Sequence, residues 1–198
     1  GNVKFTVTAS NGNVNGLGSH SNVNMTTKDV ILDLTYHYPT GNSSNGGSIY
    51  GVLAGSTVDS GELATYNGKY TTITTNALNI TQTATGGTIN AILNNGIRAI
   101  QGANQDSGKG SAGQVIVNGI LDMKLTGNRS IGIYVSGNST NTGVATAAGT
   151  NGSLTPKVIL NNNATIIINK GTDTPGFLSQ TWDSHGIKLG KVRYAGEG

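Results

Sequence analysis

Short apolar runs rich in β-branched residues alternate along this chain with two-residue polar breaks, and the pattern is clearest from Gln114 to Ser136. Three runs in that stretch, each too short for a helix, predict strands: Val115–Val117, Ile120–Leu125 and Ile131–Val135. The breaks Asn118-Gly119 and Gly127-Asn128 consist of residue types that tolerate left-handed backbone. The stretch therefore predicts consecutive strands joined by tight turns.

The parts of this stretch recur elsewhere in the chain. Matching apolar residues form two predicted columns, which are Leu78, Met123 and Ile166 in the first and Ile80, Leu125 and Ile168 in the second. Four glycines fall in register in the runs that match Ile131–Val135, namely Gly51, Gly96, Gly132 and Gly186. These glycines lie 45, 36 and 54 residues apart. A loose repeat of this length, with several strands in each unit, is typical of a solenoid.

Stacking of these repeats predicts an all-β fold, a right-handed parallel β-helix in which each run pairs with its counterpart one turn away. The residues expected to point inward are Val115, Val117, Met123, Leu125, Ile131 and Ile133. Gly and Asn suit the corners because they adopt positive φ most readily. We expect one domain over residues 1–198, with protruding loops at 136–156 and 171–185. Equivalent excursions at 56–69 and 102–113 follow the same strand of earlier units, so these three loops (56–69, 102–113 and 136–156) should emerge on one side.

The composition supports a folded chain with an unusual surface. Charged residues make up 11% of the sequence, against the usual quarter, and there are 31 Gly. Val, Ile, Leu and Phe still make up about 23%, and the net charge is only +3, so burial can offset chain entropy. The surface should therefore consist mainly of Asn, Thr, Ser and Gly.

Charge and cysteine content narrow the set of partners. The twelve Lys and Arg residues are spread from Lys4 to Arg193 without a cluster of three, although the pI is about 9.2, so we expect no nucleic-acid partner. The chain has no Cys, which removes disulfides and zinc-thiolate sites. No apolar run approaches the roughly 20 residues of a membrane span. Both ends begin or stop in strand-like sequence, so we expect any signal peptide or membrane anchor to lie outside this sequence.

The carboxylates and histidines form no catalytic pattern. Asp29 and Asp33 fall on one predicted strand face, Asp59 and Asp106 fall in equivalent excursions, and Asp122 aligns with Ala77 and Thr165. The three histidines, His20, His37 and His185, lack the spacing of a metal pair, and no GxSxG motif occurs. We therefore predict no catalytic residue, metal or cofactor. The alternative, a carbohydrate-active β-helix enzyme, requires a carboxylate cluster on one face.

The aromatic residues give the candidate contact sites. Tyr36, His37 and Tyr38 precede Pro39 at the start of a predicted loop over residues 36–47, and Phe177 and Trp182 lie in the loop 171–185. Aromatic side chains usually dominate binding energy. Each group either binds a ligand or covers the flank of the β-helix, and the sequence leaves both readings open.

The columns GIYVSG and GIRAIQG, the Asn-rich corners at 118–119 and 161–163, and the strands NALNITQT and NNNATIIINK resemble the passenger domains of Gram-negative autotransporter adhesins. The resemblance lies in the general pattern of short Asn- and Thr-rich strands and corners, with no diagnostic motif. It covers nearly the whole chain and is shared by filamentous adhesins of two-partner secretion. It implies a right-handed β-helix displayed on the bacterial cell surface, anchored through an outer-membrane translocator that this sequence does not contain, or secreted.

The resemblance also implies a non-catalytic role. The expected partners are a host cell-surface or extracellular-matrix protein or glycan, or a like molecule in self-association. A phage-type surface fibre is a further alternative to the β-helix enzyme. Adhesins of this kind bind through residues that vary freely, so the resemblance assigns no site.

Overall fold

The computed structural model of the protein describes residues 1–10, 12–19, 23–38, 48–55, 70–86, 93–100, 112–127, 129–136, 156–169 and 185–189. These residues form fourteen β-strands and no helix. Sheet A contains β1 (Val3–Ala9), β4 (Val30–Tyr38), β7 (Leu78–Gly86), β10 (Leu121–Thr126) and β13 (Ala164–Asn169). Sheet B contains β2 (Asn13–Ser19), β5 (Ser48–Ala54), β8 (Leu93–Ile100), β11 (Arg129–Ser136) and β14 (His185–Leu189). Sheet C contains β3 (Asn24–Thr26), β6 (Tyr70–Thr75), β9 (Ala112–Val117) and β12 (Lys157–Leu160).

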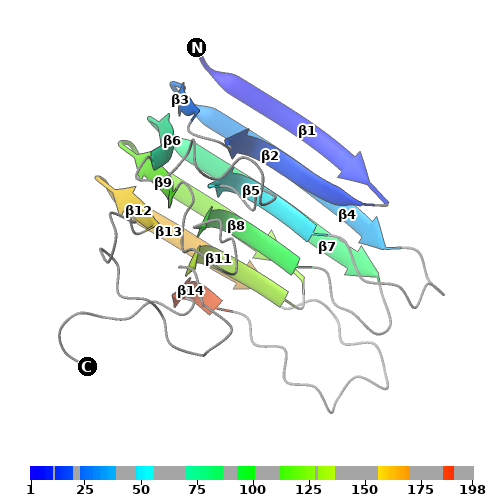
Figure 1. Ribbon diagram of the computed structural model, residues 1–198. Coiled ribbons are helices and arrows are strands. Elements are labelled where there is room, and N and C mark those ends of the chain that lie inside the picture. The colour runs from blue at the N-terminus through cyan, green and yellow to red at the C-terminus, as the bar shows by residue number, and fades with distance from the viewer. Residues whose placement is uncertain are drawn as a thin grey trace, which may run out of the picture.

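The chain visits the three sheets in a fixed order. It passes from sheet A to sheet B to sheet C and then returns to sheet A, so every strand from β1 to β11 pairs in parallel with the strand three elements later. Figure 1 shows the result as rows of parallel strands that descend from β1, near the N-terminus, to β14. The predicted all-β fold of stacked parallel strands is confirmed.

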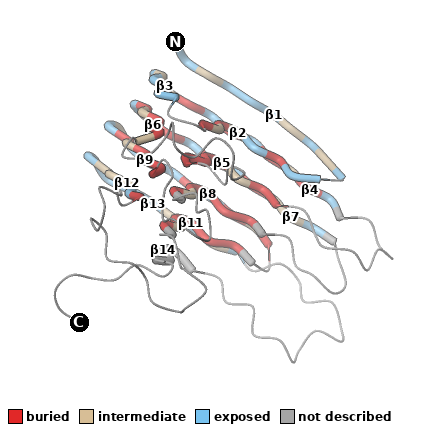
Figure 2. The backbone as a smooth tube through the Cα atoms, viewed as in Figure 1, coloured by how far each residue is buried: buried red, intermediate tan, exposed pale blue. Residues whose placement is uncertain are grey.

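One hydrophobic core receives side chains from all three sheets. Its members include Leu32 and Leu34 from sheet A, Ile49 from sheet B, and Ile73 and Val115 from sheet C. Alternate residues of each strand point to the same side, which is why these positions are buried while their neighbours in sheet A are exposed. Figure 2 shows the buried segments lying in register on successive strands.

The register corrects both predicted columns in part, because the β7 member of each is misplaced. Met123 pairs with Ile166 and Leu125 pairs with Ile168, as predicted. Leu78, however, pairs with Leu121, and Ile80 pairs with Met123. A shift of two residues keeps the same side chains inward, so hydrophobic alternation alone does not fix the register. The corner does so instead, because the N–H of Asn118 donates to the carbonyl oxygen of Thr75 at 2.9 Å.

A row of glycines crosses sheet B. The four predicted glycines are in register, and Gly16 of β2 extends the row. Core residues on either side of the row are three positions apart, as with Ile49 and Val52, instead of two. Strands β2, β5, β8 and β11 therefore change face at their glycines. The predicted core position of Ile131 is wrong for this reason: Ile133 belongs to the core, whereas Ile131, before the glycine, is buried outside it.

Neighbouring strands of sheet B pack closely against each other and against the core, which explains why the row consists of glycine. A Cβ atom on Gly96 would lie 2.7 Å from the carbonyl oxygen of Gly132 and would overlap the Sδ atom of Met123. A Cβ atom on Gly51 would lie 2.6 Å from the carbonyl oxygen of Gly96. Contacts this short are not tolerated in protein interiors. Residues larger than glycine would push apart adjacent strands of sheet B.

A buried polar cluster lies between sheets A and B. The Nε2 of Gln82 donates to the Oδ1 of Asn94 at 2.8 Å, and the Nδ2 of Asn94 donates to the Oγ of Ser130 at 2.9 Å and to the carbonyl oxygen of Thr126 at 3.1 Å. Gln82, Asn94 and Ser130 are fully buried. These hydrogen bonds compensate for much of the cost of removing the three side chains from water.

The corner between sheets C and A is short and regular. It contains two or three residues in each turn, and an asparagine begins three of the four corners: Asn76, Asn118 and Asn161. The Nδ2 of Asn161 donates to the Oδ1 of Asn118 at 2.8 Å. Backbone hydrogen bonds continue from turn to turn through this corner, for example from the N–H of Leu78 to the carbonyl oxygen of Ile120 at 2.9 Å.

The predicted loops fall at the other two corners. The excursions after β5, β8 and β11 all join sheet B to sheet C, and the segment 171–184 joins sheet A to sheet B. Of the predicted loop 136–156, Ser136 belongs to β11 and Pro156 is buried, and His185 of the loop 171–185 begins β14. The remaining residues of both loops lie outside the described part of the chain.

Candidate contact surfaces

The three aromatic residues before Pro39 belong to a strand. Tyr36, His37 and Tyr38 pair with Ala84, Thr85 and Gly86 of β7. The predicted loop over residues 36–47 is therefore wrong at its start, because β4 continues to Tyr38. Phe177 and Trp182 lie outside the described residues, so their predicted role in binding stays a prediction.

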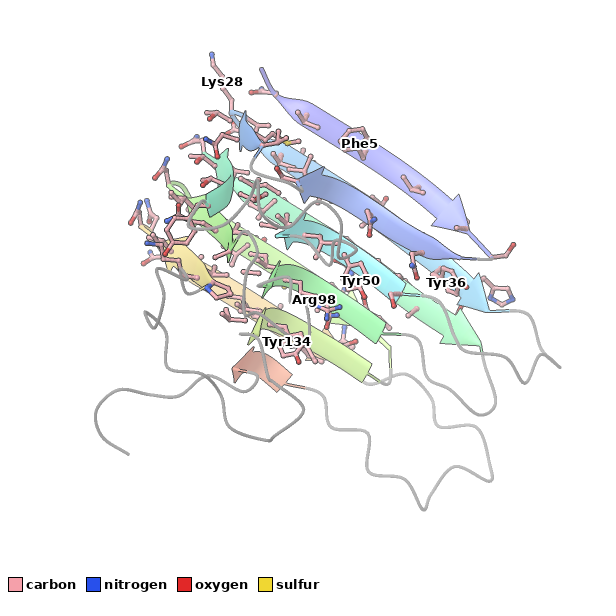
Figure 3. The ribbon with its side chains drawn as sticks, in the orientation of Figure 1. Phe5, Lys28, Tyr36, Tyr50, Arg98 and Tyr134 are labelled. Carbon is pink, nitrogen blue, oxygen red and sulfur yellow. The ribbon has the colours of Figure 1, made fainter. Side chains whose placement is uncertain are left out.

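These aromatic residues differ in how far their side chains are buried. Tyr36 is 1% exposed and belongs to the hydrophobic core (Figure 3), so its ring packs the fold and is not available to a surface ligand. The next residue, His37, is exposed, and its Nδ1 lies 2.9 Å from the Oγ1 of Thr85. The side chain of Tyr38 is outside the described set. Binding by His37 and Tyr38 stays a prediction, without Tyr36.

The outer face of sheet A is a broad polar surface, which we call the sheet A face. Three rows of in-register residues cross it: Thr8, Thr35, Thr83, Thr126 and Asn169 in the first, Thr6, Asp33, Thr81, Lys124 and Ile167 in the second, and Lys4, Ile31, Asn79, Asp122 and Thr165 in the third. The second and third rows are exposed throughout, and the first is exposed or half-buried. Parallel pairing at this register makes the surface regular across five strands.

The sheet A face carries little net charge. In these three rows Lys4 and Lys124 balance Asp33 and Asp122. Two large apolar side chains stand among the threonines, since Ile31 is 46% exposed and Ile167 is 47% exposed. A neutral surface with hydroxyl groups and a few exposed apolar groups favours contact with another macromolecule. Such a contact brings together no excess of like charge and removes few charged groups from water.

The described carboxylates are separated from one another. Asp29 lies at the corner before β4, so the prediction that it shares a strand face with Asp33 is wrong. Its Oδ1 accepts hydrogen bonds from the Nδ2 of Asn76 at 2.7 Å and from the backbone N–H of Ala77 at 3.2 Å. These two hydrogen bonds lower the pKa of the Asp29 carboxyl below its ordinary value.

Asp122 pairs with Thr165, as predicted, and with Asn79 in place of the predicted Ala77. Asp59 and Asp106 lie outside the described residues. Among the residues that the structure describes, no group of three or more His, Cys, Asp or Glu side chains could hold a metal ion. The same residues include no helix long and apolar enough to cross a membrane.

The outer face of sheet B differs from that of sheet A. Residues there that do not point into the core are nevertheless buried, including Leu53, Asn95 and Ile131. Half-buried among them are Tyr50, Arg98 and Tyr134, which the sequence reasoning did not single out. Their signal in the sequence was a large polar or aromatic residue one or two positions from each glycine of the row, in SIYGVLAG, NGIRAIQG and RSIGIYVSG.

Comparison with known proteins gives no assignment. No protein-family model, curated protein or solved structure matches the chain.

Proposed function

We propose that this chain is part of a right-handed parallel β-helix that is displayed on a bacterial surface or secreted, and that it makes adhesive contacts without catalysing a reaction. The fixed order of sheets A, B and C, with every strand parallel to its counterpart, supports the β-helix. Crossover connections between parallel strands of one sheet are right-handed in about 98% of cases, which favours that hand. A left-handed path in a crystal structure would contradict this part of the proposal.

The observation that carries the adhesive role is the sheet A face. It combines five in-register strands, mainly threonine and asparagine side chains, balanced charge and two exposed isoleucines. At a strand spacing of about 4.8 Å and a rise of about 3.3 Å per residue, the face measures about 20 Å by 20 Å. That area, about 400 Å² per partner, is below the roughly 800 Å² of a stable interface, so each contact should be weak and attachment should depend on many copies.

The partners proposed for this face are a like molecule or a host cell-surface or matrix component. The experiment uses beads coated with the protein, because many copies on one bead reproduce multivalent display. Thr81 is the central residue of the middle row, and a Thr81→Arg substitution places a long charged side chain there. We expect this variant to reduce bead clustering, or bead attachment to host cells, without changing the melting temperature.

The matched control is Thr26→Arg, which makes the same change at an exposed threonine of sheet C. Clustering in the absence of cells would identify the like molecule as the partner, and attachment without clustering would identify the host. Equal effects of the two variants, or no effect of either, would refute a role for the sheet A face. Turnover of an acidic polysaccharide by the wild-type protein would favour the alternative of a β-helix enzyme.

A further inference from the structure

An arginine lies between two tyrosine rings on the outer face of sheet B. Arg98 is on β8, which lies between β5 and β11 in the sheet, and Tyr50 and Tyr134 come from those two neighbours. The Cζ of Arg98 is 5.2 Å from the centroid of the Tyr50 ring and 5.3 Å from that of Tyr134. Its Nη1 donates to the hydroxyl oxygen of Tyr50 at 2.8 Å. Figure 3 shows the three side chains on adjacent strands.

The strand register holds this group in place. Tyr134 pairs directly with Arg98, whereas Tyr50 pairs with Asn95 and meets the guanidinium on the diagonal. Leu53, the direct partner of Arg98 on β5, is 7% exposed. Tyr50, Arg98 and Tyr134 are half-buried residues on this face. The arginine is thus oriented before any ligand arrives, which lowers the entropic cost of binding.

Arg98 carries a positive charge, and within the described part of the chain no acidic side chain forms an ion pair with it. Its Nε is buried and has no hydrogen-bond partner there. Among the described residues, the guanidinium donates one side-chain hydrogen bond, to the Tyr50 hydroxyl. A guanidinium has five N–H donors, so most of its hydrogen-bonding capacity is unused among these residues.

Lys157 also contacts an aromatic ring, but its arrangement differs from that of Arg98. The Nζ of Lys157 lies 4.6 Å from the centroid of the Tyr70 ring on sheet C. This contact involves one ring and a flexible ammonium, the usual arrangement of a lysine that packs its stem along a surface. Arg98 is planar, lies between two rings, and presents a fork of donors, which is the geometry that binds planar carboxylates.

We propose that Tyr50, Arg98 and Tyr134 form a binding site for the carboxylate of an acidic sugar. The guanidinium would donate hydrogen bonds to the carboxylate, and the tyrosine rings would pack against the apolar C–H face of the sugar. A single guanidinium matches a monoanionic carboxylate better than a dianionic phosphate. The site lies on sheet B, so this inference goes beyond the role proposed for the sheet A face, and the two proposals are tested independently.

The acidic sugar has two common sources, an internal uronic acid of a polysaccharide or a terminal sialic acid. The test is a titration of the ¹⁵N-labelled protein with a glucuronate-containing oligosaccharide and, separately, with N-acetylneuraminic acid, following the Arg98 Nε–Hε signal by NMR. Saturable shifts with only one compound would identify the source. The carboxyl-reduced oligosaccharide and the methyl ester of the sialic acid keep the sugar and remove the charge, so neither should shift the signal.

The variants of Arg98 lack the Nε–Hε group, so their affinities are followed by the backbone N–H signals of Tyr50 and Tyr134, measured for the wild type as well. Arg98→Gln should weaken binding about tenfold or more, because it removes the charged hydrogen bonds to the carboxylate. Arg98→Lys keeps the charge but not the fork, and serves as the variant if Arg98→Gln does not fold. Lys157→Gln is the matched control and should leave the affinity unchanged. Absence of a saturable shift with both acids, or equal affinity of the wild type and a folded Arg98 variant, would overturn the proposal. Bead clustering and cell attachment through the sheet A face test the other surface, so the two failures are distinguishable.

Discussion

A single methyl group added at Gly96 tests the packing of one turn of the fold on the next. The new Cβ would lie 2.7 Å from the carbonyl oxygen of Gly132, which is backbone of the adjacent strand, and would overlap the Sδ of Met123. The methionine side chain can change rotamer, but the carbonyl oxygen moves only if β11 moves. Overpacking of this kind costs about 1–3 kcal/mol. Alanine also restricts the unfolded chain, which offsets about 0.4–1 kcal/mol of that cost.

The balance predicts that Gly96→Ala lowers the free energy of unfolding by about 1–2 kcal/mol. For a chain of 198 residues that corresponds to a fall in melting temperature of about 2–8 °C. Urea denaturation, followed by far-UV circular dichroism, gives the free energy directly if unfolding is two-state. Thr81→Ala, at an exposed position, is the control and should stay within about 0.5 kcal/mol of the wild type.

A double-mutant cycle separates the two contacts. Met123→Ala alone should cost about 2–5 kcal/mol because it leaves a cavity in the core. Combined with Gly96→Ala it should cost less than the sum, by about 0.5 kcal/mol or more, since the new methyl group partly fills that space. Additive effects would show that the two side chains do not meet. A Gly96→Ala protein as stable as the wild type would refute the close approach of sheet B strands altogether.

Three further substitutions test other parts of the fold. Met123→Asp places an unpaired charge at a fully buried position, so it should cost several kcal/mol or prevent folding, and a thermal melt with an unchanged midpoint would contradict the inward assignment. Gln82→Ala removes the donor to the buried Oδ1 of Asn94 and should cost about 1–3 kcal/mol by urea denaturation, whereas a neutral effect would show that the cluster adds nothing to stability. Asp29 has a lowered pKa in the folded state, so it stabilises the protein above its unfolded pKa, and that contribution disappears as pH falls through the folded pKa. The difference in melting temperature between wild type and Asp29→Ala should therefore be largest near neutral pH and vanish in acid, and a pH-independent difference would contradict the hydrogen bonds from Asn76 and Ala77.

Hydrophobic alternation and the glycine register predicted most of the described fold. Alternation identified the inward residues Val115, Met123 and Leu125, and the glycines aligned sheet B correctly. The register of β7 was not recoverable from alternation, because a shift by two residues leaves the inward set unchanged. The change of face at the glycine row reversed the assignment of Ile131, since strict alternation does not include a change of face.

The candidate sites were harder to predict than the fold. Proline after Tyr38 indicated a loop, but β4 continues to Tyr38 because its pairing with β7 is available up to that residue. Tyr36 consequently points into the core. Arg98 and its two tyrosines come from three different strands, and Tyr50 and Arg98 are 48 positions apart in the sequence. The contact of Tyr50 with Arg98 depends on a diagonal register that no local pattern specifies.

The corner between sheets C and A also determines where this protein can accept new sequence. That corner has two or three residues in every turn, whereas the connection from sheet B to sheet C ranges from four residues after β2 to twenty after β11. Lengthening a connection costs about 0.6 kcal/mol for each doubling of its length, but a residue inserted at the corner between sheets C and A would displace the backbone hydrogen bonds that join successive strands there. Foreign peptides or altered recognition segments should therefore be tolerated after β5, β8 and β11 and rejected after β6 and β9. Variation among natural versions of such a chain would concentrate at the same connections, so the protein could change what it presents while keeping its scaffold.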